Sequence, residues 1–281
     1  MSDLGFTLPI GDGVEAVVEF LLDNFTPAFD AIADVVEAVV DAFAVALAWM
    51  PWWAMIIIIT GIAFWRVGRG FALFAVIALL ALVGMDLWDA TMRSLSLVIA
   101  STLLSLAIGL PLGIAAARSD RVENTLRPAL DLMQTMPPFV YLIPAVMFFG
   151  LGQVPGAIAT VIFSMPPAVR LTALGIRQVP AEMVEAGRAF GCSDRQLLYK
   201  VQLPNALPAI MAGVNQTIML SLSMVVIASM IGAGGLGNEV LRGIQRLDIG
   251  LGFEAGLGVV VLAIVLDRLT QSVGRSKARK R

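Results

Sequence analysis

Residues 94–117 read SLSLVIASTLLSLAIGLPLGIAAA, a run of 24 residues without a charged side chain. As an α-helix with a rise of 1.5 Å per residue, the run is about 36 Å long. This length exceeds the hydrocarbon core of a membrane, which is roughly 30 Å thick. The run therefore predicts a membrane-spanning helix.

Six further apolar runs lie elsewhere in the chain, at about residues 49–65, 71–85, 128–150, 155–176, 206–233 and 249–269. Met55–Ile59 and Val259–Leu266 lack the alternation of apolar and polar residues that is typical of a transmembrane β-barrel strand. We therefore expect an all-α integral membrane protein with about seven transmembrane helices. The first two runs are shorter, and the alternative for them is a re-entrant pair.

The composition of the whole chain agrees with a membrane protein. Of its 281 residues, 58% are hydrophobic and 14% charged, whereas a soluble domain has about 45–50% apolar and about 25% charged residues. The absence of histidine excludes histidine-ligated metals and Ser-His-Asp nucleophiles. A membrane-embedded enzyme would need paired carboxylates, thiols or metal ligands, and no convincing cluster of these occurs. We expect no catalytic or metal-binding residues and no enzyme activity.

The charge distribution predicts the orientation in the membrane. With a cytoplasmic C-terminus, 16 of the 19 basic residues lie in cytoplasmic segments, as the positive-inside rule requires. Seven spans then place the N-terminus outside. The first 48 residues contain nine acidic residues and no basic one, which favours their export.

The chain divides into an acidic external amphipathic tail (1–48), two accessory transmembrane helices (49–88), a five-span core (89–274) and a basic cytoplasmic tail (275–281). In the first of these, Glu15, Glu19 and Asp23 recur every fourth residue, which predicts a helix lying on the outer membrane face. The alternatives are two helices that break near Pro27, or a cleaved signal peptide, whose basic start is missing.

One long polar loop, about residues 177–205, separates the fifth run from the sixth on the expected cytoplasmic side. Residues 179–204, VPAEMVEAGRAFGCSDRQLLYKVQLP, predict two short helices. The first ends at Gly191, a C-cap residue. The second begins with a capping box, in which Ser193 and Gln196 bond to backbone N–H groups.

This loop resembles the EAA loop of the membrane subunits of bacterial ABC importers. Glu185-Ala186-Gly187 is followed by Gly191 and then by Val201-Gln202-Leu203-Pro204 at the spacing of that motif, with Gly187 in place of Ala and Val201 in place of Ile. Five further stretches, residues 134–144, 166–172, 201–217, 223–237 and 267–271, resemble the permease subunit of the glycine betaine/proline importer. The resemblance covers about residues 70–274 and implies a type I importer permease core.

The resemblance also implies a function and partners. We expect ATP-driven import of a compatible solute, namely glycine betaine or proline betaine, with proline as a weaker substrate. The implied partners are a second copy of this chain, two ATPase subunits, an external substrate-binding protein and membrane lipid, with no nucleic acid. The location is the bacterial cytoplasmic (inner) membrane. Because the chain lacks a Gly-x-x-x-x-Gly-Lys-Ser/Thr loop, ATP and Mg belong to the partner ATPase, and this chain binds no cofactor.

The residues that match the motif are the implied ATPase-coupling residues: Glu185, Ala186, Gly187, Phe190, Gly191, Leu203 and Pro204. Phe190 is expected to be the apolar anchor, and Glu185 to pair with a basic group of the ATPase. The small residues beside them permit close approach. The alternative for Glu185 is that it is only solvated.

Polar side chains inside the apolar runs are candidates for the translocation pathway, because their exposure to lipid is costly. The candidates are the polar residues Gln134, Thr135, Asn215, Gln216, Ser221 and Ser223, together with Met136, which directly follows Thr135. Neutral hydrogen-bonding walls suit a zwitterion. The alternative is that these groups only bond helices to one another. The pairs Pro137-Pro138 and Pro166-Pro167 predict bends or kinks in their helices.

Other transporters remain as alternatives. A permease for choline or carnitine, or for methionine, belongs to a related branch of ABC importers. An ion-coupled secondary transporter places ionisable groups at mid-membrane and usually has inverted repeats, neither of which is evident. Asp131 and Glu254 lie near the ends of their runs, where each side chain can reach an interface.

Overall fold

The computed structural model describes residues 10–278, and every regular element in that part of the chain is a helix. In chain order they are α1 (Ile10–Trp49), α2 (Trp52–Arg66), α3 (Arg69–Gly84), α4 (Trp88–Arg118), α5 (Asp120–Thr135), α6 (Pro138–Phe149), α7 (Gln153–Arg177), α8 (Ala181–Ala189), α9 (Asp194–Leu197), the π-helix η1 (Leu198–Gln202), α10 (Leu203–Ser229), α11 (Leu236–Arg246) and α12 (Ile249–Ala278). The all-α class is confirmed.

Four helices are long and apolar enough to cross a membrane. They are α4, α7, the continuous stretch Asp194–Ser229 that ends with α10, and α12 as far as Ser272. Two bent pairs, α1 with α2 and α5 with α6, pass the same test when each pair is taken together, and α3 is a shorter apolar helix. The described residues therefore contain four to six candidate spans, where the sequence predicted about seven.

The predicted run 128–150 is broken in the structure. Helix α5 ends at Thr135 and α6 begins at Pro138, and the two axes are bent by 102°. Met136 and Pro137 are both extended, with ψ of 135° and 136°, because a residue that precedes a proline is driven out of the helical region. Two such residues in succession end the helix.

The second proline pair behaves differently, because it lies inside the bundle. Pro166 and Pro167 are buried within the unbroken helix α7. On one side, a Cβ atom added to Gly109 of α4 would lie 3.2 Å from the Met165 side chain. On the other, one added to Gly213 of α10 would lie 3.1 Å from the Pro167 carbonyl oxygen. Small residues thus let α4 and α10 enclose α7.

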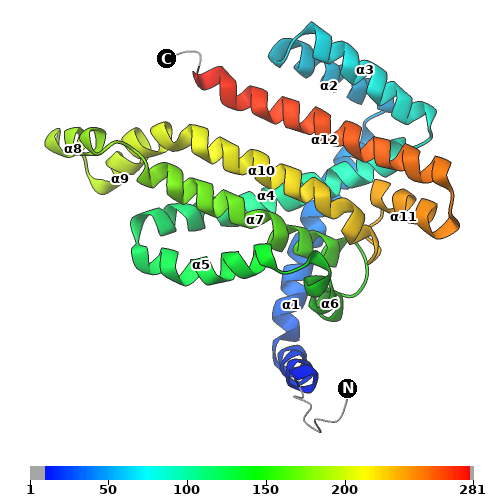
Figure 1. The fold of residues 1–281 in the computed structure, drawn as a ribbon, viewed down its shortest axis with the longest axis horizontal. Coiled ribbons are helices and arrows are strands. Elements are labelled where there is room, and N and C mark those ends of the chain that lie inside the picture. Colours follow the sequence, from blue (N-terminus) through cyan, green and yellow to red (C-terminus); the bar gives the residue numbers. More distant parts are fainter. Residues whose placement is uncertain (1–9, 279–281) are drawn as a thin grey trace, which may run out of the picture.

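Helices α4, α7 and α10 run side by side through the bundle, and α12 lies across α10 (Figure 1). Helices α2 and α3 pack on α12 through a buried cluster that includes Ile56, Leu79 and Val261. The predicted accessory pair, α2 and α3, therefore contacts α12, the last helix of the predicted core. The predicted basic tail 275–281 is helical as far as Ala278, and residues 279–281 lie outside the described part.

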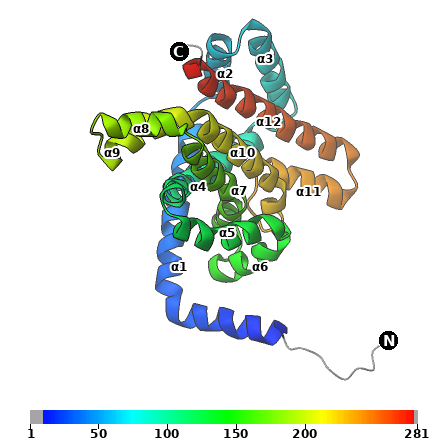
Figure 2. The same cartoon turned by 60° about the vertical axis from the view of Figure 1, so that its left-hand side comes forward.

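The N-terminal helix, which the sequence predicted to lie on the outer membrane face, packs against the bundle through its second half. Val36 and Val40 are buried in a cluster with Ala100 of α4 and Ala157 of α7, and the Phe29 ring stacks on that of Phe148 in α6 with centroids 4.5 Å apart. Helix α1 contains Pro27, and Figure 2 shows that it bends sharply, with its first part directed away from the bundle. Residues 1–9 of the predicted tail lie outside the described residues.

Candidate functional site

The predicted long loop forms a compact projection at one end of the bundle. Helices α8 and α9 lie beyond the ends of α7 and α10 in both views (Figures 1 and 2). Stretch Asp194–Ser229 is one continuous helical segment through α9, η1 and α10. The loop is therefore joined directly to a helix of the bundle core.

Hydrogen-bonded caps form at the end of α8 and at the start of α9, as the sequence predicted. Gly191 has φ of 77°, its N–H donates to the Arg188 carbonyl (2.9 Å), and the Cys192 N–H donates to the Gly187 carbonyl (3.1 Å). These bonds close α8. The capping box of α9 is confirmed, since the Ser193 N–H donates to Gln196 Oε1 (2.9 Å) and the Gln196 N–H donates to Ser193 Oγ (3.4 Å).

Three of the seven proposed coupling residues face the bundle or lie partly within it. Gly187 is buried, and a Cβ atom there would lie 2.7 Å from Leu197 Cδ1 of α9. Leu203 packs against a cluster formed by Ile176, Leu198 and Ala206, and the neighbouring Pro204 is half-buried. The small size of Gly187 therefore serves contact between α8 and α9.

The other coupling candidates form the outer side of the projection. Glu185, Ala186 and Gly191 are exposed, and the Phe190 side chain is 89% exposed. Among the described residues, Glu185 has no ion-pair partner. We name Glu185, Ala186 and Phe190 the outer face of α8, and its exposed aromatic ring is typical of a protein-binding surface.

Sequence reasoning missed two further large side chains on this loop. Met183 is 42% exposed and Tyr199 is 66% exposed. The sequence signal for them was their large side chains in an otherwise polar segment. Neither residue is part of the motif. Both side chains are accessible to a partner.

The pathway candidates fall into two groups in the structure. Gln134 and Thr135 are exposed at the end of α5, and Met136 is half-buried in the break that follows. Gln216 and Ser223 are exposed on α10. They belong to a row of exposed residues that recur every three or four positions and thus share one side of the helix, which we name the open face of α10: Pro208, Ala212, Gln216, Met219 and Ser223.

Ser221 and Asn215 belong to the second group, which joins helices. Ser221 is fully buried, and its Oγ accepts a hydrogen bond from Thr102 Oγ1 of α4 (3.2 Å). Asn215 Nδ2 donates to Asp267 Oδ1 (2.9 Å), and Asn215 Oδ1 accepts from Thr270 Oγ1 (2.7 Å). These bonds connect α10 to α4 and α12, so the alternative of bonding between helices describes both residues.

Comparisons with known proteins agree with these features. A family model described as "Binding-protein-dependent transport system inner membrane component" matches residues 109–279. The "Glycine betaine/proline betaine transport system permease protein ProW" of Escherichia coli (strain K12) is 51% identical over 268 residues, which are 95% of this chain and 76% of that protein. The "Glycine betaine transport system permease protein OpuAB" of Bacillus subtilis (strain 168) is 46% identical over 266 residues, which are 95% of this chain and 94% of that protein.

A solved structure supports the fold. An inward-facing conformation of the MetNI methionine ABC transporter has a chain that matches with a TM-score of 0.59 at 23% identity. The match covers 69% of this chain and 95% of that chain. At this identity the likeness concerns the arrangement of helices alone.

Proposed function

Because the chain belongs to the family of binding-protein-dependent transport system inner membrane components and is an ABC importer permease, we propose that it carries glycine betaine and proline betaine into the cell. The observation that supports this substrate is that the relatives named for betaine transport match 95% of the chain, at 51% and 46% identity. Proline is a weaker substrate. A separate ATPase subunit hydrolyses the ATP, and an external binding protein delivers the solute.

The ATPase docks on the outer face of α8. Phe190 is the apolar anchor, because an 89% exposed aromatic side chain gains most from burial in a partner's groove. Glu185, which is exposed at the same helix, pairs with a basic group of the ATPase. Gly187, Leu203 and Pro204 act indirectly, since they hold α8 and α9 against the bundle.

A continuous helix transmits the motion of the ATPase. Stretch Asp194–Ser229 joins the loop to the bundle without a break, and the caps at Gly191 and Ser193 hold α8 to α9. A displacement of α8 therefore tilts α10 as a rigid body, which is a recognised form of switching transition.

The open face of α10 borders the translocation pathway together with Gln134 and Thr135. Polar side chains such as Gln216 and Ser223 are unfavourable against lipid tails, and the open face is not covered by the described residues of this chain. A second copy covers it in the assembled transporter, with the pathway between the copies. The positive-inside rule favours a cytoplasmic position for α8 and the C-terminus, and the nine acidic residues without a basic one in the first 48 residues favour an external N-terminus.

Reconstituted uptake tests the substrate directly. The permease is placed in proteoliposomes with its ATPase and binding protein, and ATP-dependent uptake of labelled glycine betaine is measured against carnitine, choline and methionine. We expect betaine uptake to exceed the others at least severalfold and to stop without ATP. Methionine uptake without betaine uptake would contradict the assignment, and uptake without the ATPase would indicate a secondary transporter.

A further inference from the structure

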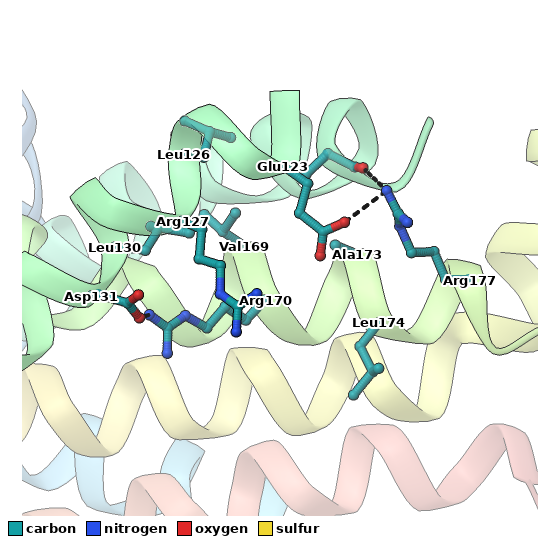
Figure 3. A pocket seen from close by; sticks show the side chains of 11 residues that line it. Glu123, Leu126, Arg127, Leu130, Asp131, Val169, Arg170, Ala173, Leu174 and Arg177 are labelled. Atoms are coloured by element: carbon teal, nitrogen blue, oxygen red, sulfur yellow. Dashed lines mark hydrogen bonds and ion pairs between the residues drawn. The ribbon is translucent and has the colours of Figure 1, made fainter. Parts of the chain in front are cut away.

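A cavity between α5 and α7 has no role in the function described so far (Figure 3). Its volume is 360 Å³, which lies within the range of about 300–1,000 Å³ found for small-molecule sites. The lining combines an apolar wall with charged groups: Ala116, Leu126, Leu130, Val169, Ala173 and Leu174, with Glu123, Arg127, Asp131, Arg170 and Arg177. Such a wall with a few polar groups is the usual composition of a ligand site.

Two of the three arginines at the cavity are already paired. Arg170 donates to Asp131, and Arg177 Nη2 lies 2.8 Å from both Asp120 Oδ1 and Glu123 Oε2. Arg127 makes no ion pair with any residue that the structure describes. Figure 3 shows the Arg127 side chain extending from α5 toward α7, into the region where the labelled charged residues gather. The cavity therefore holds one guanidinium whose donors are free to bind a ligand.

The charges of the cavity balance, which distinguishes it from an anion site. Three arginines line it, and they are matched by Glu123 and Asp131 in the lining and by Asp120 on Arg177. A site for phosphate or for an anionic headgroup would have an excess of positive charge. The cavity instead offers both an unpaired guanidinium, at Arg127, and carboxylate oxygens, at Asp131 and Glu123, to a ligand that carries both signs.

The side of α5 that carries Arg127 is too polar to face lipid tails. Its exposed residues Asn124, Arg127, Asp131 and Gln134 recur every three or four positions and so share one side of the helix. Arg127 comes directly before the apolar run 128–150, and Asp131 and Gln134 lie within that run. Polar and charged groups at membrane depth normally face a water-filled route or the protein interior. Gln134 is also a candidate pathway residue, so the cavity lies along the same side of α5 as the proposed pathway.

We propose that the cavity is a transit site for the solute, a small zwitterion with a methylated ammonium group, on the permease itself. This inference rests on the proposed function. The solute carboxylate binds the free guanidinium of Arg127, which offers unoccupied donors for a charge-assisted pair. The quaternary ammonium, which has no N–H group, lies near Asp131 without displacing Arg170. The methyl groups contact the apolar wall.

Binding at this site is weak, because both members of the nearby ion pair are partly exposed. The Arg170 and Asp131 side chains are 40% and 54% exposed, and water and salt screen such charges. We expect a dissociation constant on the order of millimolar. A transit site must release its solute, so weak binding agrees with the role.

Site-specific labelling tests binding without relying on transport. Leu174→Cys, on the cavity wall and 46% exposed, is introduced with Cys192→Ser in the permease assembled with its ATPase. Its reaction rate with a water-soluble thiol reagent is measured with and without glycine betaine at tens of millimolar. We expect at least a twofold slowing, and none for Thr125→Cys, an exposed position of α5 outside the cavity. Arg127→Gln should abolish the protection.

Each other outcome of the labelling contradicts the proposal. Protection by inorganic phosphate at matched ionic strength, without protection by betaine, would show an anion site. Anionic lipid vesicles in place of phosphate then distinguish a headgroup from a free ion. Protection by neither solute would show that the charged groups only hold α5 against α7.

Uptake at saturating loaded binding protein provides a second test. Arg127→Gln should lower the maximal uptake rate several-fold, with Arg127→Lys intermediate, while the ion pairs of Arg170 and Arg177 remain and the assembly with the ATPase is retained. Arg121→Gln, on α5 but outside the cavity lining, should transport normally. Normal uptake by Arg127→Gln would overturn the transit site and leave the proposed function intact, whereas a parent that imports no betaine would overturn the function itself.

Discussion

At the scale of single residues, Gly187 within α8 and Phe190, directly after its end, differ in their surroundings. Gly187 is buried, with the position of its absent Cβ only 2.7 Å from Leu197 Cδ1, and Phe190 is 89% exposed. A methyl group at Gly187 meets the flexible end of a leucine side chain, which can move by a change of rotamer. The loop therefore tolerates a small addition at Gly187, whereas the large Phe190 side chain is exposed.

We expect Phe190→Ala to weaken binding of the ATPase about 30-fold, the loss that follows from removing a buried interface anchor worth about 2 kcal/mol. Its melting temperature should equal that of the parent, because the side chain is exposed in the free chain. Binding is measured between the permease in nanodiscs and the labelled ATPase. Gly187→Ala is the matched control and should bind within about threefold of the parent. Equal binding by Phe190→Ala and the parent would remove Phe190 from the coupling surface.

At the scale of elements, α1 is attached to the bundle by one side of its second half. The Val40 side chain is 1% exposed among Ala100, Ala157 and Ala228, whereas Val35, in the same helix, is 58% exposed. We expect Val40→Ala to lower the free energy of unfolding by about 1–2 kcal/mol, from the loss of buried methyl groups and the remaining cavity. Val35→Ala should change it by less than about 0.5 kcal/mol.

Denaturant unfolding of the detergent-solubilised protein, followed by tryptophan fluorescence, measures this difference in stability. The two substitutions are chemically identical, so they share the same effect on helix propensity. Equal destabilisation by both would mean that α1 does not dock on the bundle through Val40. Val36, in the same buried cluster, and the aromatic stack of Phe29 on Phe148 would then be attachments that remain.

Features that depend on neighbouring residues were predictable from the sequence. The C-cap at Gly191 and the capping box of Ser193 and Gln196 were predicted and are confirmed, because the groups that bond lie within five positions of one another. The apolar runs likewise predicted helices at α4, α7, α10 and α12. Length and periodicity are sufficient for such elements.

Features that depend on distant residues were not predictable in this way. Pro137-Pro138 ends a helix and Pro166-Pro167 does not, since only the second pair is enclosed by helices from other parts of the chain. The pairing of Asp131 with Arg170, 39 residues later, was missed for the same reason. Ser221 and Ser223 are both serines in the same apolar run, yet Ser221 is buried against Thr102 and Ser223 is exposed. Tertiary packing decides each of these cases.

At the scale of the whole molecule, the open face of α10 is the part of the chain that requires a partner. Gln216 and Ser223 are exposed there, on a helix that is otherwise apolar enough to cross a membrane. Contact with lipid tails would leave the Gln216 amide without hydrogen-bond partners, whereas the Ser223 hydroxyl already donates to the Met219 carbonyl (3.0 Å). In the proposed assembly a second copy removes that cost, because two such faces would enclose a polar route between them.

Cross-linking between copies tests this arrangement in native membranes. Ser223→Cys with Cys192→Ser, treated with a short bifunctional thiol reagent, should give a product of twice the permease mass, because the two open faces lie opposite each other across the pathway. Leu257→Cys is the control, since that residue is 41% exposed on the apolar helix α12. We expect little product there. A strong product at Leu257 and none at Ser223 would place α12 at the contact between copies and the open face elsewhere, and the pathway assignment of Gln216 would fail with it.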